Sequence, residues 1–280
     1  MARFGEARSH ADGFLDLAFA PVAGRTRLVR AVHRMPLLVQ RTQYLDPAAP
    51  DMAFVPLLAV GGGVLGGDRL TQCVRVESGA AAHLTTQAAT KLYRAERGYA
   101  TMDTLLHVLP GGRLEYVPLP IIAQAGARWA SRVRLVAEPG SAAIIGEILV
   151  PGRLARGECG AFDAVALIAE GRPAPDAEPT WRDALLLLGG TASARDTIAT
   201  LIAVAPEMPG AALADALAPA VAMACGAGVF GGVSDLPGNG GAMVRMIGAD
   251  APAVTAAHRA AWAAARGLVF GLPLPPLRRT

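Results

Sequence analysis

Residues 70–86, LTQCVRVESGAAAHLTT, carry the pattern that decides the fold. From Leu70 to Val76 the side chains alternate between two sets, which is the two-residue period of a β-strand. Ser78-Gly79 then interrupts the strand, and residues 82–86 resume it. The stretch therefore predicts two strands joined by a glycine turn.

The same unit recurs along the chain. Val76 is followed by Gly79 and Leu84, Val108 by Gly111 and Leu114, and Val136 by Gly140 and Ile144. A fixed spacing of about 30 residues is typical of stacked layers, each of which buries its face on the next. Three loose copies are also consistent with ordinary antiparallel hairpins, and residues 110–112 fit either a hairpin or a corner.

The last third of the chain changes character. Residues 211–225 are rich in Ala and Leu and predict a helix that Gly226 ends. Asp250 and Pro252 open a second helix, which we expect to end near Gly267. Strands over 229–233 and 242–247 flank a hairpin turn at 236–240. We therefore expect one mainly β domain over residues 1–280, with a β-rich body to about residue 190 and a helix-containing part from about 191.

Composition limits the class of protein. Hydrophobic residues make up 52% of the 280 residues and charged residues 18%, which suits either a membrane protein or a soluble protein with apolar surface for partners. A spanning helix needs about 20 apolar residues in a row. The longest apolar runs are short or contain Asp215 and Pro219, and no secretory signal precedes them. We expect a cytoplasmic protein with no membrane partner.

Charge and cysteine content exclude other classes. The net charge is +3 and aromatic residues make up 5%, so a nucleic-acid partner is not expected. Basic residues gather only at Arg25, Arg27, Arg30 and Arg34, which we interpret as a solvated face. The three cysteines, Cys73, Cys159 and Cys225, have neither the number nor the spacing of a disulfide framework or a structural zinc site.

Two short blocks stand out. Residues 61–68, GGGVLGGD, contain Gly61, Gly62, Gly63, Gly66 and Gly67 before Asp68. A phosphate-binding loop would need a helix behind the glycines, whereas residues after Asp68 have strand period, so a turn that fixes Asp68 is favoured. Residues 85–94, TTQAATKLYR, are polar in an apolar chain and predict either a hydrogen-bonding face or a surface turn.

Acid–base chemistry would need two carboxylates facing one cleft, and the candidates are Asp68, Glu115, Glu147 and Glu158. Glu147 lies inside the apolar run 144–150, where it shares a strand face with Ile145 and Leu149. We therefore expect it to be either outward and solvated or in a partly apolar, paired setting. No histidine pair has the spacing of a metal site, and no GxSxG elbow is present.

At these residues the sequence resembles the UreD family of urease accessory proteins, also called UreH. The matching segments are residues 36–41 (PLLVQR), 61–68 (GGGVLGGD), 84–94 (LTTQAATKLYR), 114–118 (LEYVP), and Gly152-Arg153 with Gly157-Glu158. Met35 stands where the family pattern has glycine, and residues 119–123 lack its usual polar and aromatic residues.

The resemblance implies an elongated, β-helix-like body of stacked sheets with a few helices, mostly in the C-terminal third. It also implies a chaperone without catalytic activity that works with UreF-like and UreG-like proteins and apo-urease subunits to insert nickel. No cofactor would be tightly bound, and Asp68 and Glu147 would contact nickel transiently. The remaining motif residues would be structural or partner-facing: Gly61, Gly62, Gly63, Gly66, Gly67, Gln87, Thr90, Lys91, Tyr93, Arg94, Arg153 and Glu158.

Two alternatives remain open from the residues alone. One is a β-helical hydrolase or lyase that uses two of the four candidate carboxylates, which would then lie roughly 5–10 Å apart in a cleft. The other is a nucleotide-binding module built on the glycine block. A helix directly after Asp68 would favour the nucleotide-binding module, and a strand there would exclude it.

Overall fold

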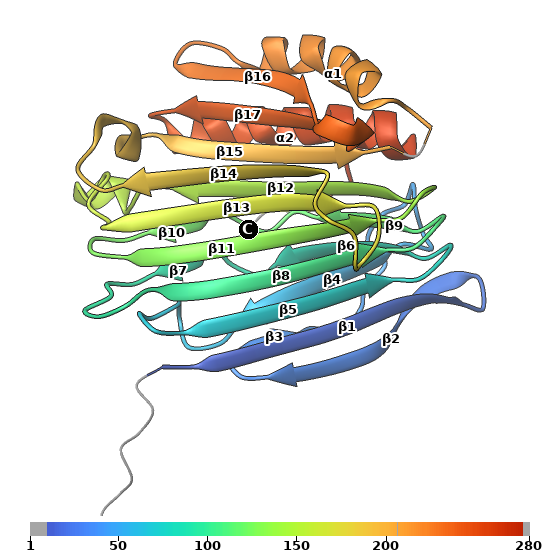
Figure 1. The fold of residues 1–280 in the computed structure, drawn as a ribbon, viewed down its shortest axis with the longest axis horizontal. Helices are drawn as coiled ribbons and strands as arrows, with labels where there is room; N and C mark the ends of the chain where they lie inside the picture. Colours follow the sequence, from blue (N-terminus) through green and yellow to red (C-terminus); the bar gives the residue numbers. More distant parts are fainter. Residues whose placement is uncertain (1–9, 206, 277–280) are drawn as a thin grey trace, which may run out of the picture.

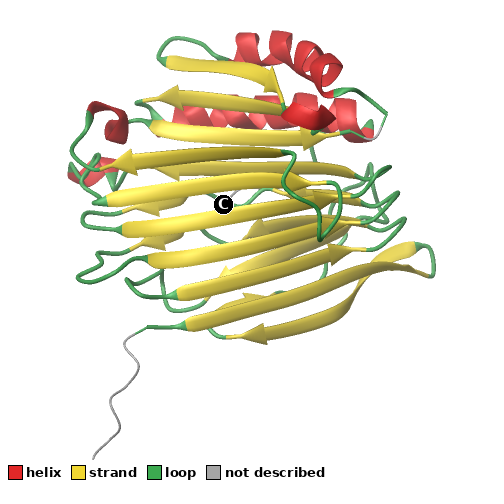
Figure 2. Ribbon diagram, viewed as in Figure 1, coloured by secondary structure: helices red, strands yellow, loops and turns green. Residues whose placement is uncertain are grey.

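The computed structural model describes residues 10–205 and 207–276, which fold into two β-sheets stacked face to face with two helices on one of them (Figures 1 and 2). The first sheet has the order β14 (Trp181–Leu188), β13 (Ala164–Arg172), β11 (Arg128–Ala137), β8 (Ala100–Val108), β5 (Arg69–Val76), β1 (Asp12–Val22) and β2 (Arg25–Arg34). The second has the order β16 (Val229–Asp235), β17 (Ala242–Gly248), β15 (Thr197–Val204), β12 (Ala142–Val150), β9 (Arg113–Tyr116), β6 (Ala81–Thr86), β4 (Ala53–Ala59) and β3 (Leu37–Val39). Two short strands, β7 (Thr90–Leu92) and β10 (Ile121–Ala123), join it beside β12.

The middle of the chain winds as a solenoid. It passes from β5 to β6 and β7, then from β8 to β9 and β10, and then from β11 to β12. Each coil therefore contributes one strand to the first sheet, and the first two coils contribute a long and a short strand to the second. Equivalent strands of successive coils pair in parallel. β5, β8 and β11 begin at Arg69, Ala100 and Arg128, so the coils are 100 − 69 = 31 and 128 − 100 = 28 residues long. The repeat therefore forms stacked coils, and the hairpin interpretation is wrong because the chain changes sheets at each glycine turn.

The glycine turns form one corner of the solenoid. Gly79, Gly111 and Gly140 all have positive φ, at 73°, 73° and 84°. The N–H of Gly111 donates to the carbonyl oxygen of Gly140 at 3.0 Å, so the corners stack on one another. Residues with a Cβ rarely adopt this backbone region, which explains why glycine recurs at the same place in each copy.

The C-terminal part adds antiparallel strands and the helices. β15, β17 and β16 extend the second sheet, and β16 and β17 form the predicted hairpin. Helices α1 (Gly210–Ala224) and α2 (Ala251–Phe270) cover the outer face of this sheet. The expected end of the second helix at Gly267 is wrong. The helix continues one turn to Gly271, whose left-handed conformation and N–H bond to the Gly267 carbonyl end it.

Two apolar cores hold these layers together. One lies between the two sheets and contains inward residues of β1, β5, β8 and β11, and the other lies between the second sheet and the helices. β12 and β15 are mostly apolar on both faces, because one face meets the first sheet and the other meets α2. The mainly β, solenoid-like fold with its helices near the C-terminus is confirmed. Among the described residues, no helix combines the length and apolarity needed to cross a bilayer.

Candidate functional site

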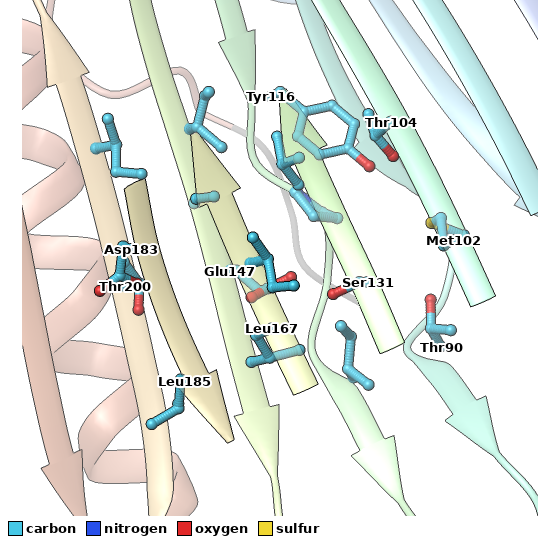
Figure 3. Close-up of a pocket in the computed structure, with 18 of the residues that line it drawn as sticks. Thr90, Met102, Thr104, Tyr116, Ser131, Glu147, Leu167, Asp183, Leu185 and Thr200 are labelled. Atoms are coloured by element: carbon cyan, nitrogen blue, oxygen red, sulfur yellow. The ribbon is translucent and has the colours of Figure 1, made fainter. Parts of the chain in front are cut away.

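A cavity of about 70 Å³, with polar side chains in a mostly apolar wall, lies between the two sheets beside β12 (Figure 3). The second sheet contributes Tyr116, Glu147 and Thr200 to its wall, and the first contributes Ser131 and Asp183. Figure 3 shows Glu147 between Thr200 and Asp183 on one side and Ser131 on the other. The cavity therefore places a carboxyl group among hydroxyl groups inside an otherwise apolar core.

Glu147 points into this cavity because of strand alternation. It shares the inward face of β12 with Ile145 and Leu149, as the sequence predicted, and sits directly opposite Thr200 of β15. Burial raises the pKa of the Glu147 carboxyl to about 7, with Arg245 opposing the rise and Asp183 adding to it. A carboxyl group with this pKa exchanges its proton near neutral pH.

The other polar groups of the wall are only partly satisfied by the protein. The Tyr116 hydroxyl donates to Oε1 of Gln72 at 3.2 Å, and Arg245 is paired with Asp183. The Ser131 hydroxyl and the Trp129 indole N–H are buried without a hydrogen-bond partner among the described residues. Unsatisfied polar groups in a core are rare and are expected where water or a passing ligand supplies the missing bonds.

A second cavity, of about 340 Å³, adjoins the first. Its wall includes residues 61–63 of the glycine block and residues 86–91 of the polar block. The two cavities have four wall residues in common: Gln72, Thr86, Thr90 and Met102. The two cavities are therefore neighbours, one beside the two sequence motifs and the other beside Glu147.

The two motifs themselves pack together as a parallel bridge. The N–H of Val64 donates to the Lys91 carbonyl at 2.8 Å, and the N–H of Tyr93 donates to the Val64 carbonyl at 2.9 Å. A Cβ on Gly63 would lie 2.7 Å from the Lys91 carbonyl oxygen and 2.4 Å from the Tyr93 ring. Glycine is needed here because two backbone segments approach too closely for a side chain.

Replacing Gly63 with alanine is expected to lower the free energy of unfolding by about 1–3 kcal/mol, because the backbone carbonyl of Lys91 cannot move aside without loss of the bridge. The matched control is Gly232→Ala in β16, where an added Cβ meets nothing within 4 Å. Guanidinium denaturation of the two variants measures the difference. Equal stability would mean that the glycine block tolerates a side chain and that its packing is not the reason for glycine.

Asp68 has a structural setting. One carboxylate oxygen accepts the N–H of Ala11 at 2.6 Å and the other accepts the N–H of Leu65 at 2.8 Å, and the side chain is buried. It ties the start of β1 to the glycine block, as expected of a fixed turn, and lies outside the wall of both cavities. β5 begins directly after it, at Arg69, so the nucleotide-binding interpretation of the glycine block is wrong.

The remaining motif residues fall into two groups. Gln87, Thr90 and Lys91 surround the second cavity. The Tyr93 hydroxyl donates to the Gly62 carbonyl at 3.1 Å, and Arg94 packs on Gly126. Arg153 and Glu158 form a bidentate ion pair on the surface, which lowers the pKa of the Glu158 carboxyl. Their partner-facing role stays a prediction.

The four candidate carboxylates do not gather in one cleft. In the register of β9 and β12, Glu115 lies beside Ile144 whereas Glu147 is two residues beyond Ile145, so the two acids face opposite sides of the second sheet. Asp68 and Glu158 are held by the bonds described above. The described residues also contain no cluster of three or more His, Cys, Asp or Glu side chains suited to a metal ion.

Sequence reasoning missed a buried ionic network behind the second sheet. Glu115 accepts hydrogen bonds from Arg266 Nε at 2.8 Å and from the Trp262 indole at 3.1 Å, and its other oxygen meets His83 Nδ1 at 2.8 Å. Arg266 also pairs with Asp46. Burial opposes ionisation of Glu115, but the bond to His83 and the charges of His83 and Arg266 lower its pKa. The sequence gives one hint of this network, an arginine (Arg266) four residues after a tryptophan (Trp262) in an alanine-rich helix.

Fold and cavity together define a β-solenoid protein with a cavity between its two sheets. The model of the UreD urease accessory protein family matches residues 11–280, and the chain belongs to this family. It is 37% identical to urease accessory protein UreD 2 of Streptomyces griseus, over 95% of this chain and 93% of that protein. It is 33% identical to the UreD proteins of Haloarcula marismortui and Natronomonas pharaonis, over 96% of this chain in both comparisons and over 90% and 91% of those proteins. Membership supports a role in urease maturation.

Proposed function

We propose that this protein is a non-catalytic, cytoplasmic accessory protein that helps insert nickel into apo-urease, in a complex with UreF-like and UreG-like proteins. Family membership supports the maturation role. The observation that carries the nickel step is the pair of neighbouring cavities, one beside the motif blocks and one beside Glu147, whose shared wall includes Gln72, Thr86 and Thr90. In this proposal nickel is cargo that passes through the protein and is not a resident cofactor.

The chemistry of the cavity suits weak, reversible contact with a divalent cation. Carboxylate and hydroxyl oxygens bind divalent first-row metals less tightly than imidazole or thiolate sets do. Among the described residues of the wall, the carboxylates are Glu147 and Asp183, and Arg245 already neutralises Asp183. A single free carboxylate offsets part of the cost of desolvating the ion and binds it weakly enough to release it.

Proton exchange would accompany each contact. Since the Glu147 pKa is about 7, an arriving cation displaces a proton and a departing cation allows one to return. The exchange compensates one of the two charges of a divalent cation, which lowers the cost of holding the ion in a medium of low polarity. Asp68 is the second proposed contact, and its bonds to the N–H groups of Ala11 and Leu65 would open during transfer.

Co-expression of urease subunits and the other accessory proteins, with and without this chain, tests the proposal. We expect urease activity and urease-bound nickel to fall together when the chain is absent. We expect Glu147→Gln to lower both at least tenfold and the exposed control Glu178→Gln to leave both unchanged. Full activity without the chain would contradict the maturation role, whereas full activity with Glu147→Gln would contradict only the interior route.

A further inference from the structure

The strand β2 is a free edge of the first sheet. It pairs with β1 on one side, and Figure 1 shows it at the rim of the sheet. Thr26 is held by bonds to Asp51 and Tyr44. Among the described residues, the backbone of residues 27–34 bonds to β1 alone. The N–H and C=O groups on the outer side of this segment are thus available to another strand.

This edge also carries exposed apolar side chains. Val29 and Val32 are 54% and 43% exposed. A register shift leaves Val29 without a partner on β1, since Ala18 pairs with Arg30 and Phe19 with Leu28. Met35 and Leu45, close to the same edge, are exposed as well. Apolar side chains gathered on one exposed strand are typical of a binding surface.

The charge of the edge is basic. β2 contains Arg25, Arg27, Arg30 and Arg34 and no acidic residue. Arg30 and Arg34 reach Asp16 and Asp12 of β1 in exposed ion pairs, which contribute at most about 1 kcal/mol each. Arg25 and Arg27 stack on the ring of Tyr44, at 5.1 and 5.7 Å from its centroid. Within the part of the chain that the structure describes, Arg25 and Arg27 have no carboxylate partner, and Arg30 and Arg34 are held only by weak pairs.

We propose that the outer edge of β2 binds an acidic, extended segment of a partner protein as an added β-strand. Free backbone groups select a strand, the exposed valines accept its apolar side chains, and the arginines select its carboxylates. An anionic membrane would satisfy the arginines but would leave the strand edge unpaired, which favours a peptide. The test of this interface does not depend on the nickel proposal, because peptide binding is measured on the isolated chain.

The test uses three fluorescein-labelled decapeptides. One alternates Glu and Val, one has the same sequence with alternate backbone nitrogens methylated, and one replaces Glu with Lys. Fluorescence anisotropy should show binding of the acidic peptide alone, and hydrogen exchange should slow for amides of residues 27–34 when it is bound. Arg25→Glu combined with Arg27→Glu should weaken binding at least tenfold.

The matched control is Arg132→Glu combined with Arg156→Glu, which changes net charge equally at exposed sites outside β2 and should retain binding. Circular dichroism of each variant confirms that its β-structure is intact. Equal binding of the methylated peptide would reduce the interaction to charge attraction and overturn the added strand. Absence of binding, or binding only to vesicles containing phosphatidylserine, would also overturn it, and the arginines would then act only to protect the edge.

Discussion

Replacing Glu115 with alanine is expected to lower the free energy of unfolding by about 3–5 kcal/mol, the cost of removing one partner of a buried ion pair. Glu115 and Arg266 are both fully buried, between β9 of the second sheet and α2. Without the carboxylate, the Arg266 guanidinium keeps Asp46 and loses the partner of its Nε. A domain with a typical stability of about 5–15 kcal/mol would lose much of it.

The loss of stability should come from weaker packing of α2 against the second sheet. Trp262 also donates to Glu115, and the His83 ring lies 5.5 Å from the Trp262 ring, so strand and helix meet through this one group. Guanidinium denaturation measures the stability, and the near-ultraviolet circular dichroism that Glu115→Ala loses in a Trp129→Phe, Trp181→Phe background, where Trp262 is the remaining tryptophan, reports the docking. The control is Glu77→Ala, which removes an exposed pair with Arg75 and should cost less than about 1 kcal/mol.

A triple variant separates burial of charge from loss of packing. Glu115→Leu with Arg266→Met and Asp46→Asn removes all three charges and keeps the volume, so it should recover at least half of the lost stability. A loss below about 1 kcal/mol in Glu115→Ala would mean that water reaches the network. Failure of the triple variant to recover stability would mean that the hydrogen bonds, and not the unpaired charge, hold α2.

The solenoid was predictable because its signals are local. Strand alternation around Val74 and the recurring glycines at 79, 111 and 140 each lie within a few residues, and a left-handed corner requires glycine wherever it occurs. The sequence left corner and hairpin undecided at residues 110–112. Whether a chain turns back on itself or crosses to a second sheet depends on which strands pair, and this is set by contacts far apart in the chain.

The interior site was predictable only in part. Alternation placed Glu147 with Ile145 and Leu149, and this face is inward. Its companions could not be foreseen: Asp183 and Arg245 come from β14 and β17 of different sheets and meet beside it only after folding. The same reason hid the network of Glu115, whose partners are 32 and 151 residues away.

The second large effect is expected from Glu147→Gln, which should stabilise the protein above neutral pH. The Glu147 pKa is raised from its ordinary value of 4.5 to about 7, so the folded state holds this proton more tightly than the unfolded state does. The stability that the protonated group contributes is fully present below pH 4.5 and is lost between about pH 4.5 and 7. At pH 8 the half-buried carboxylate costs at most about 3.5 kcal/mol, because each tenfold change in proton affinity is worth about 1.4 kcal/mol.

Glutamine resembles the protonated acid and carries no charge to desolvate. The stability difference between Glu147→Gln and the parent should thus be near zero at pH 4.5, grow between pH 4.5 and 7, and stay constant above it. Denaturation with guanidinium at pH 5, 6, 7 and 8 measures this curve, and Glu178→Gln, on an exposed loop, should show none of it. A flat difference would mean that the cavity is hydrated well enough for Glu147 to ionise as it does in water. The near-neutral exchange of proton for cation would then have no energetic basis, and transfer would depend on the geometry of the cavity alone.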